Sequence, residues 1–76
     1  MKLVTIESPD SEVMDEVFGS LGFTNTGIGE ALSVLREVLE EQGYVIRVHR
    51  YPEDGVVELQ VEGPFGEPGT LVIRRQ

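Results

Sequence analysis

The chain has 76 residues with a formal net charge of −8, from 14 acidic and six basic side chains, and it contains no cysteine. This length suits a single small domain over residues 1–76, and the lack of thiols excludes a disulfide framework and a thiolate zinc site. The acidic balance argues against direct nucleic-acid binding, and no apolar run approaches the roughly 18 residues of a membrane-spanning helix, so we expect a soluble, cytoplasmic protein with no membrane contact.

The first predicted strand covers residues 2–7, KLVTIE, which form a short, apolar and partly β-branched run. Ser8 is the predicted cap of the helix that follows, and Pro9 suits its first turn. Apolar side chains at helical spacing then indicate that helix: Val13, Met14, Val17, Phe18 and Leu21. Gly22 is its predicted end.

The second predicted helix has the clearest pattern in the chain. Its apolar stripe consists of Ile28, Ala31, Leu32, Leu35, Val38 and Leu39. Its other face carries Glu30, Ser33, Arg36, Glu37, Glu40 and Glu41, and Gly43 is its predicted end. Residues 8–43 hold eight acids and one base, a net charge of −7, whereas residues 44–76 hold five acids and four bases, a net charge of −1. We therefore expect a strongly acidic helical layer and a nearly neutral sheet.

From Tyr44 onward the apolar period changes to two, which is typical of strands with one buried face. Three strands are predicted, over residues 44–51, 56–62 and 70–75, with the turn PEDG and the longer connection GPFGEPG between them. The side chains expected to face the helices are Ile46, Val48, Val57, Leu59, Val61, Leu71 and Ile73. The elements predict an α+β fold, a two-layer α/β sandwich in the order β-α-α-β-β-β, with a mostly antiparallel four-stranded sheet and both helices on one face.

The stretch FTNTGIGEAL is the part of the chain that most favours ligand binding. It contains Thr24, Asn25, Thr26 and Gly27. This T-x-T-G run resembles the phosphate loop of flavodoxins, and the resemblance implies a flavin phosphate held by hydroxyls and by backbone N–H groups at a helix N-terminus. It also implies a fold of about five parallel strands, for which this chain has no room. The interpretation we prefer is that Thr24 or Thr26 caps the second helix and that the loop binds no cofactor.

Alternation places a mixed set of side chains on the sheet face away from the helices. The set includes Val45, Arg47, His49, Tyr51, Val56, Glu58, Gln60, Val72 and Arg74. His49 is expected to be solvated there, because no nucleophile and carboxylate are recognisably arranged for catalysis. The candidate interface residues are Val45, Arg47, Tyr51, Val56, Glu58 and Val72, together with Phe65 in the loop between two prolines. The alternatives are a simply exposed β-branched face, and a loop that folds Phe65 back over the core.

We expect a non-enzymatic protein-protein interaction or regulatory module, such as an inhibitor, an adaptor or a nucleic-acid mimic, which acts through its acidic helical layer or its sheet face. Neither a catalytic set nor a metal-ligand pattern is recognisable in the sequence. The expected partner is a protein with a basic surface, and burial of the sheet face predicts a homodimer. The alternative function is a binder of a small ligand or a phosphate-containing cofactor that uses Thr24–Gly29.

Overall fold

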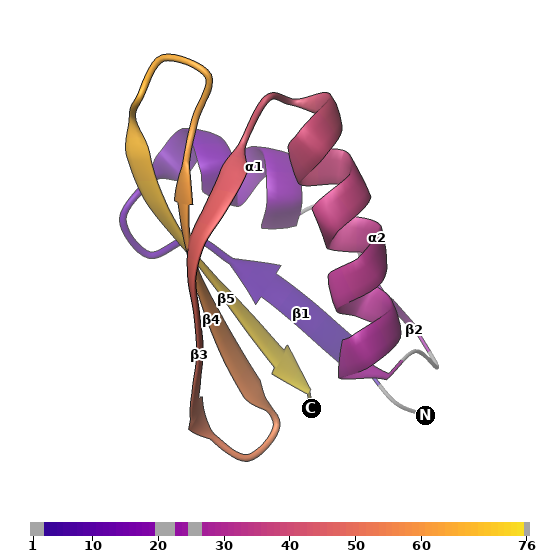
Figure 1. Cartoon of the computed structure of the whole chain (residues 1–76). Helices are drawn as coiled ribbons and strands as arrows, with labels where there is room; N and C mark the ends of the chain where they lie inside the picture. The colour runs from indigo at the N-terminus through magenta and orange to yellow at the C-terminus, as the bar shows by residue number, and fades with distance from the viewer. Residues whose placement is uncertain (1–2, 20–22, 25–26, 76) are drawn as a thin grey trace.

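The computed structural model describes residues 3–19, 23–24 and 27–75. In chain order its elements are β1 (Leu3–Glu7), α1 (Glu12–Gly19), β2 (Phe23–Thr24), α2 (Ile28–Glu41), β3 (Val45–Glu53), β4 (Val56–Glu62) and β5 (Pro68–Arg75) (Figure 1). The strands form one antiparallel sheet in the order β2-β1-β5-β4-β3. The predicted α+β fold is confirmed, with β1, β3, β4 and β5 as the four predicted strands, and the two-residue β2 extends the sheet at one edge.

Both helices pack against the same face of the sheet, and the core lies between the two layers (Figure 1). The helices contribute Met14, Phe18, Ala31, Leu32, Leu35 and Leu39, and the strands contribute Val4, Ile6, Val57, Leu59, Val61, Leu71 and Ile73. Leu35, Leu59 and Leu71 are fully buried, as their spacing predicted. The rings of Phe18 and Tyr44 make a T-shaped contact with centroids 5.8 Å apart, which joins α1 to the residue before β3.

The start of α1 differs from the prediction. Ser11 caps this helix, since its Oγ accepts a hydrogen bond of 3.2 Å from Met14 N. The predicted cap, Ser8, is instead buried beside the sheet, where its Oγ donates to Thr70 O at 2.8 Å and its N–H donates to Asp15 Oδ1 at 3.0 Å. The hydroxyl of Ser8 is therefore engaged by β5 and does not serve as a helix cap.

The start of α2 also differs from the prediction. Its N-cap is Gly27, which makes no side-chain cap hydrogen bond. The predicted Thr24 cap is wrong, because Thr24 belongs to β2 and pairs with β1. The other predicted cap, Thr26, and the predicted end of α1 at residues 21–22 lie outside the described residues.

The helix α2 ends at Glu41, just before Gly43, as the sequence predicted. Gly43 has a φ of +82°, a conformation that glycine adopts without strain. Its N–H donates to Glu40 O at 3.0 Å, and the N–H of Tyr44 donates to Leu39 O at 2.8 Å, which together form a Schellman motif. Gly43 also lies against Pro64 of the β4–β5 loop, since a Cβ added there would be 3.1 Å from the Pro64 Cβ. This contact brings the end of α2 next to that loop.

Bulges in β3 change which of its side chains face the helices. Ile46 lies opposite Val61, whereas Val48 lies opposite Gln60, so Arg47 is an extra residue in the pairing with β4. One inserted residue inverts the alternation that follows it. The prediction that Val48 faces the helices is therefore wrong, and a second register shift lies between residues 50 and 53.

His49 lies on the opposite face of the sheet from the one predicted. It pairs in register with the buried Leu59 and faces the helices, where its Nδ1 lies 3.4 Å from Arg36 Nη2 of α2. Tyr51 lies on the same side, with its ring centroid 4.8 Å from that of His49. The predictions that His49 and Tyr51 face away from the helices are therefore wrong. The cause is the same for both, because an alternating pattern does not show where a residue has been inserted.

Candidate interaction surface

Ion pairs cover the sheet face away from the helices, which we call the outer face. Arg74 Nε lies 3.0 Å from Glu7 Oε1, and Arg74 Nη1 lies 3.9 Å from Glu53 Oε1, so this side chain connects residues of β1 and β3. Arg50 Nη1 lies 3.9 Å from Glu58 Oε1. Such exposed pairs stabilise the fold by only about 0–1 kcal/mol each. Their main consequence is that the charges of this face are largely satisfied within the molecule.

The predicted interface residues differ in how much surface they leave for a partner. Val56 and Val72 expose only 8% and 9% of their surface, so a partner could bury little more of either side chain. Val45 is half exposed, at 50%. Tyr51 is 68% exposed but lies on the helix-facing side of β3. The apolar patch on the outer face is therefore much smaller than alternation indicated.

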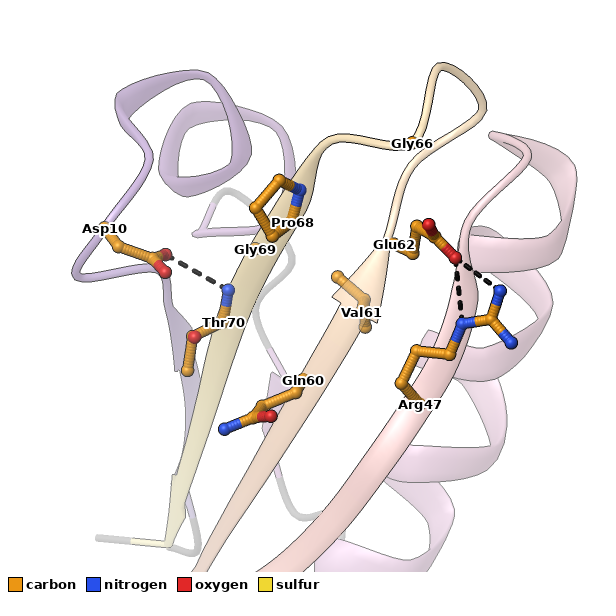
Figure 2. A pocket seen from close by; sticks show the side chains of 9 residues that line it. All are labelled: Asp10, Arg47, Gln60, Val61, Glu62, Gly66, Pro68, Gly69 and Thr70. Carbon is orange, nitrogen blue, oxygen red and sulfur yellow. Dashed lines mark hydrogen bonds and ion pairs between the residues drawn. The ribbon is translucent and has the colours of Figure 1, made fainter.

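A pocket of about 340 Å³ opens at one end of the outer face, and we call it the loop-end pocket (Figure 2). Its lining residues are Asp10, Arg47, Gln60, Val61, Glu62, Gly66, Pro68, Gly69 and Thr70. Figure 2 shows Asp10 at one side and Arg47 at the other, with Gln60 and Thr70 between them. The turn before α1 supplies Asp10, the bulge of β3 supplies Arg47, and β4 and β5 form the floor.

Hydrogen bonds within the protein fix the polar groups of the loop-end pocket. Arg47 donates from Nε and from Nη2 to the same oxygen of Glu62, Oε2, with the Nε bond at 2.9 Å. Asp10 Oδ1 accepts from Thr70 N at 3.1 Å and from Ser8 Oγ at 3.3 Å. Among the described residues, no hydrogen bond joins the second carboxylate oxygen of Glu62 or the amide of Gln60 to another group of the protein.

The carboxyl of Asp10 is held in its ionised form. Desolvation raises its pKa, but the hydrogen bonds from Thr70 and Ser8 together outweigh that effect, and the pKa lies below its ordinary value. The pocket therefore keeps a negative charge at one side at neutral pH. Sequence reasoning missed this role of Asp10, because Asp10 and Thr70 are 60 residues apart and meet only when β5 pairs with β1.

The β4–β5 loop beside the pocket is an ordered turn, and we call residues 63–67 the Phe65 loop. Gly63 N donates to Glu67 O at 2.8 Å, and Gly66 N donates to Gly63 O at 3.0 Å. Phe65 N donates to Glu67 Oε2 at 2.9 Å. Gly66 has a φ of +79°, which lets the chain reverse here. The Phe65 side chain stands away from the molecule and is 93% exposed, as the sequence interpretation of an exposed apolar group expected.

The T-x-T-G run does not occupy the setting that its resemblance to flavodoxins implies. The sheet is antiparallel, whereas the resemblance implies a parallel sheet. Thr24 lies in β2, and Gly27 is the N-cap of α2. Asn25 and Thr26 lie outside the described residues.

The part of the chain that the structure describes shows neither a metal-binding cluster nor a membrane-spanning helix. No three or more histidine, aspartate or glutamate side chains gather there in a way that could hold a metal ion. Neither of the described helices has the length and hydrophobicity that crossing a bilayer requires. Comparisons with protein-family models, curated proteins and solved structures give no significant match.

Proposed function

We propose that the protein is a small, non-enzymatic interaction module that docks on a larger protein through its acidic helical side. The observation that carries this proposal is the composition of the exposed helical surface. The exposed acids of the two helices and the turn before α1 are Asp10, Glu12, Asp15, Glu16, Glu30, Glu37, Glu40 and Glu41. Arg36 is the one basic residue among the described residues of that layer. A surface of this sign attracts a partner with a basic surface.

Exposed apolar side chains lie among these acids. Val13 of α1 is 69% exposed and Val34 of α2 is 44% exposed. Apolar groups surrounded by charge are typical of interfaces, where the apolar contacts supply affinity and the charges supply association rate. The charges of the outer face are paired internally and its valines are largely covered, so the helical side is favoured over the sheet face as the docking side.

The proposal is tested with a matched pair of charge variants. Affinity capture from the source cells and mass spectrometry identify the partner, and calorimetry on the purified pair measures Kd. Glu37→Gln with Glu41→Gln removes two exposed charges from α2, and Glu53→Gln with Asp54→Asn removes two from the opposite end of the molecule. We expect the α2 variant to raise Kd by about five- to thirtyfold, since each exposed contact contributes up to about 1 kcal/mol. Equal effects of both variants would contradict docking through the helical side.

A homodimer through the outer face is a second proposal. Its support is the half-exposed Val45 beside the Arg47–Glu62 ion pair. In a dimer with two-fold symmetry, Arg47 of one copy could pair with Glu62 of the other, and the reverse pair would form as well. Sedimentation equilibrium at high micromolar concentration tests it, with twice the chain mass expected and a monomer mass as the contrary result.

We also propose a cytoplasmic location, since a chain without cysteine needs no oxidising compartment for its folding.

A further inference from the structure

We infer that the partner docks at one end of the molecule, on the Phe65 loop and the loop-end pocket beside it, and that it presents an apolar pocket with a basic rim. The inference rests on the proposed function and adds the location and the chemistry of the contact. The loop and the α2–β3 connection lie at the same end of the sheet, opposite the β3–β4 turn (Figure 1). Asp10, from the turn before α1, lines the same pocket, so this end is continuous with the acidic helical side.

The exposure of Phe65 has no explanation within the fold. At 93% exposure its ring covers no part of the core and contributes nothing to burial. The turn itself is built by backbone hydrogen bonds, by the carboxylate of Glu67 and by the positive φ of Gly66, none of which requires an aromatic side chain at the tip. Aromatic side chains, phenylalanine among them, are enriched at the buried centre of protein interfaces. Phe65 is suited to that position because no intramolecular contact has to be broken for the ring to enter a pocket.

Contacts within the Phe65 loop and with the end of α2 restrain the loop. A Cβ at Gly63 would overlap Glu67 Oε1, so the Glu67 side chain is folded closely over the backbone of the turn. Pro64 packs against Gly43 at the end of α2, which anchors the loop to the helical layer. Preorganisation of this kind lowers the conformational entropy that is lost on association, and it increases affinity without new contacts.

The charges around Phe65 define the rim of the partner's pocket. Three carboxylates lie at this end, on Asp10, Glu62 and Glu67, and the guanidinium of Arg47 is the basic group of the loop-end pocket, which leaves a net charge of −2. Arg47 binds one oxygen of Glu62, and the other oxygen remains free within the described residues. Asp10 adds a second carboxylate at the other side of the pocket. A lysine or arginine of the partner that enters the pocket finds these acceptors and the amide of Gln60 together.

The size of the loop-end pocket fits this assignment. Its volume of about 340 Å³ is at the small end of the range of about 300–1,000 Å³ for ligand sites. It is large enough for the end of one long basic side chain, and its position beside the Phe65 loop allows one partner to fill it while holding the ring. The two contacts therefore form a single docking surface with an apolar anchor and an acidic receptor.

A photo-crosslinking experiment locates the contact. The full chain is produced with p-benzoyl-phenylalanine in place of Phe65, of Val34 on α2, or of Tyr51 on β3, and each form is irradiated with source-cell extract. The crosslinked peptides are then sequenced by mass spectrometry. We expect a partner peptide joined at position 65, with apolar residues at the crosslink and lysine or arginine beside them in the partner. Crosslinks at position 34 without any at position 65 would leave the proposed function standing and overturn this inference. Crosslinks at none of the three positions would overturn both.

Substitutions then test the two contacts separately against the partner so identified. Phe65→Ala should raise Kd about tenfold or more, with an unchanged melting temperature because the ring is exposed. Tyr51→Ala is the control, since it removes an aromatic ring that is 68% exposed elsewhere.

Asp10→Asn keeps an acceptor for Thr70 N and removes the charge, and it should weaken binding at low salt more than at high salt. Equal Kd values for Phe65→Ala and Tyr51→Ala would overturn the anchor, and an unchanged Kd for Asp10→Asn at low salt would overturn the basic rim.

Discussion

At the scale of single residues, two glycines show how packing decides the effect of one added methyl group. Gly69 lies opposite Val61 on the helix-facing side of β5 and is buried, and a Cβ there would overlap the sulfur of Met14. Gly29 lies in the first turn of α2, is exposed, and has nothing within 4 Å of a Cβ added to it. The same substitution is therefore expected to act in opposite directions at these two positions.

Gly69→Ala should lower the free energy of unfolding by about 1–3 kcal/mol, because Met14 has to move within a packed core. Gly29→Ala should raise it by about 0.5–1 kcal/mol, since alanine loses less conformational freedom in a helix than glycine does. Urea unfolding of the two variants beside the unmodified protein measures both effects. A gain in stability at Gly69 would contradict the packing of α1 on β5.

Asp10 links the stability of the fold to pH. Its pKa in the folded protein is lowered, so the ionised carboxyl stabilises the fold above the ordinary aspartate pKa of about 3.9. That stabilisation is lost as the pH falls through the folded-state pKa. Asp10→Asn should therefore flatten the decline in melting temperature below about pH 4, relative to the unmodified protein. Identical pH profiles for the two proteins would show that the hydrogen bonds from Thr70 and Ser8 do not favour the ionised carboxyl.

At the scale of elements, regular periodicity is what the sequence predicts well. The stripe that includes Leu32, Leu35 and Leu39 predicts α2, and the alternation around Leu59 predicts β4, because repeated burial of one face imposes a period on the chain. The sequence did not reveal the bulge at Arg47, since an inserted residue leaves each half of the strand with a normal pattern. It did not reveal the two-residue β2 either, which is too short to carry any period.

The candidate site also has one feature that the sequence predicts and others that depend on the folded sheet. The exposure of Phe65 follows from a local signal, an apolar residue in a loop between prolines, and the structure agrees with it. The loop-end pocket depends on side chains that the sheet brings together from distant segments, such as Asp10 beside Thr70 and Arg47 beside Glu62. No local pattern in the sequence carries that information, because it comes from strand order and register.

The inverted face of β3 can be tested by substitution. His49 Nε2 is buried and has no hydrogen-bond partner among the described residues, which costs free energy. His49→Leu should therefore raise the free energy of unfolding by about 1 kcal/mol, and Val48→Leu on the outer face should change it by less than about 0.5 kcal/mol. Chemical denaturation of the two variants measures both values. A loss of stability in His49→Leu would show that its contact with Arg36 outweighs the buried nitrogen.

At the scale of the whole molecule, the charges are separated between the layers. Among the described residues, the acids of the helical side form no ion pair, while the outer face carries arginines paired with glutamates on neighbouring strands. The two sides meet at the end that holds the Phe65 loop and the loop-end pocket (Figures 1 and 2). The exposed Phe65, the loop-end pocket and the acidic helical side thus lie on one contiguous part of the molecule, as the proposed docking function requires.

The most direct measurement is an NMR map of the complex, in which unlabelled partner is added to the ¹⁵N-labelled protein. The amides of Phe65, Gly66 and Thr70 and the side-chain amide of Gln60 should show the largest shift changes. Val56 and Val72, which lie on the part of the outer face outside the loop-end pocket, should move little. The reverse result, with large changes at those valines and unmoved signals from residues 63–70, would contradict docking at the Phe65 loop and place the partner on the sheet face.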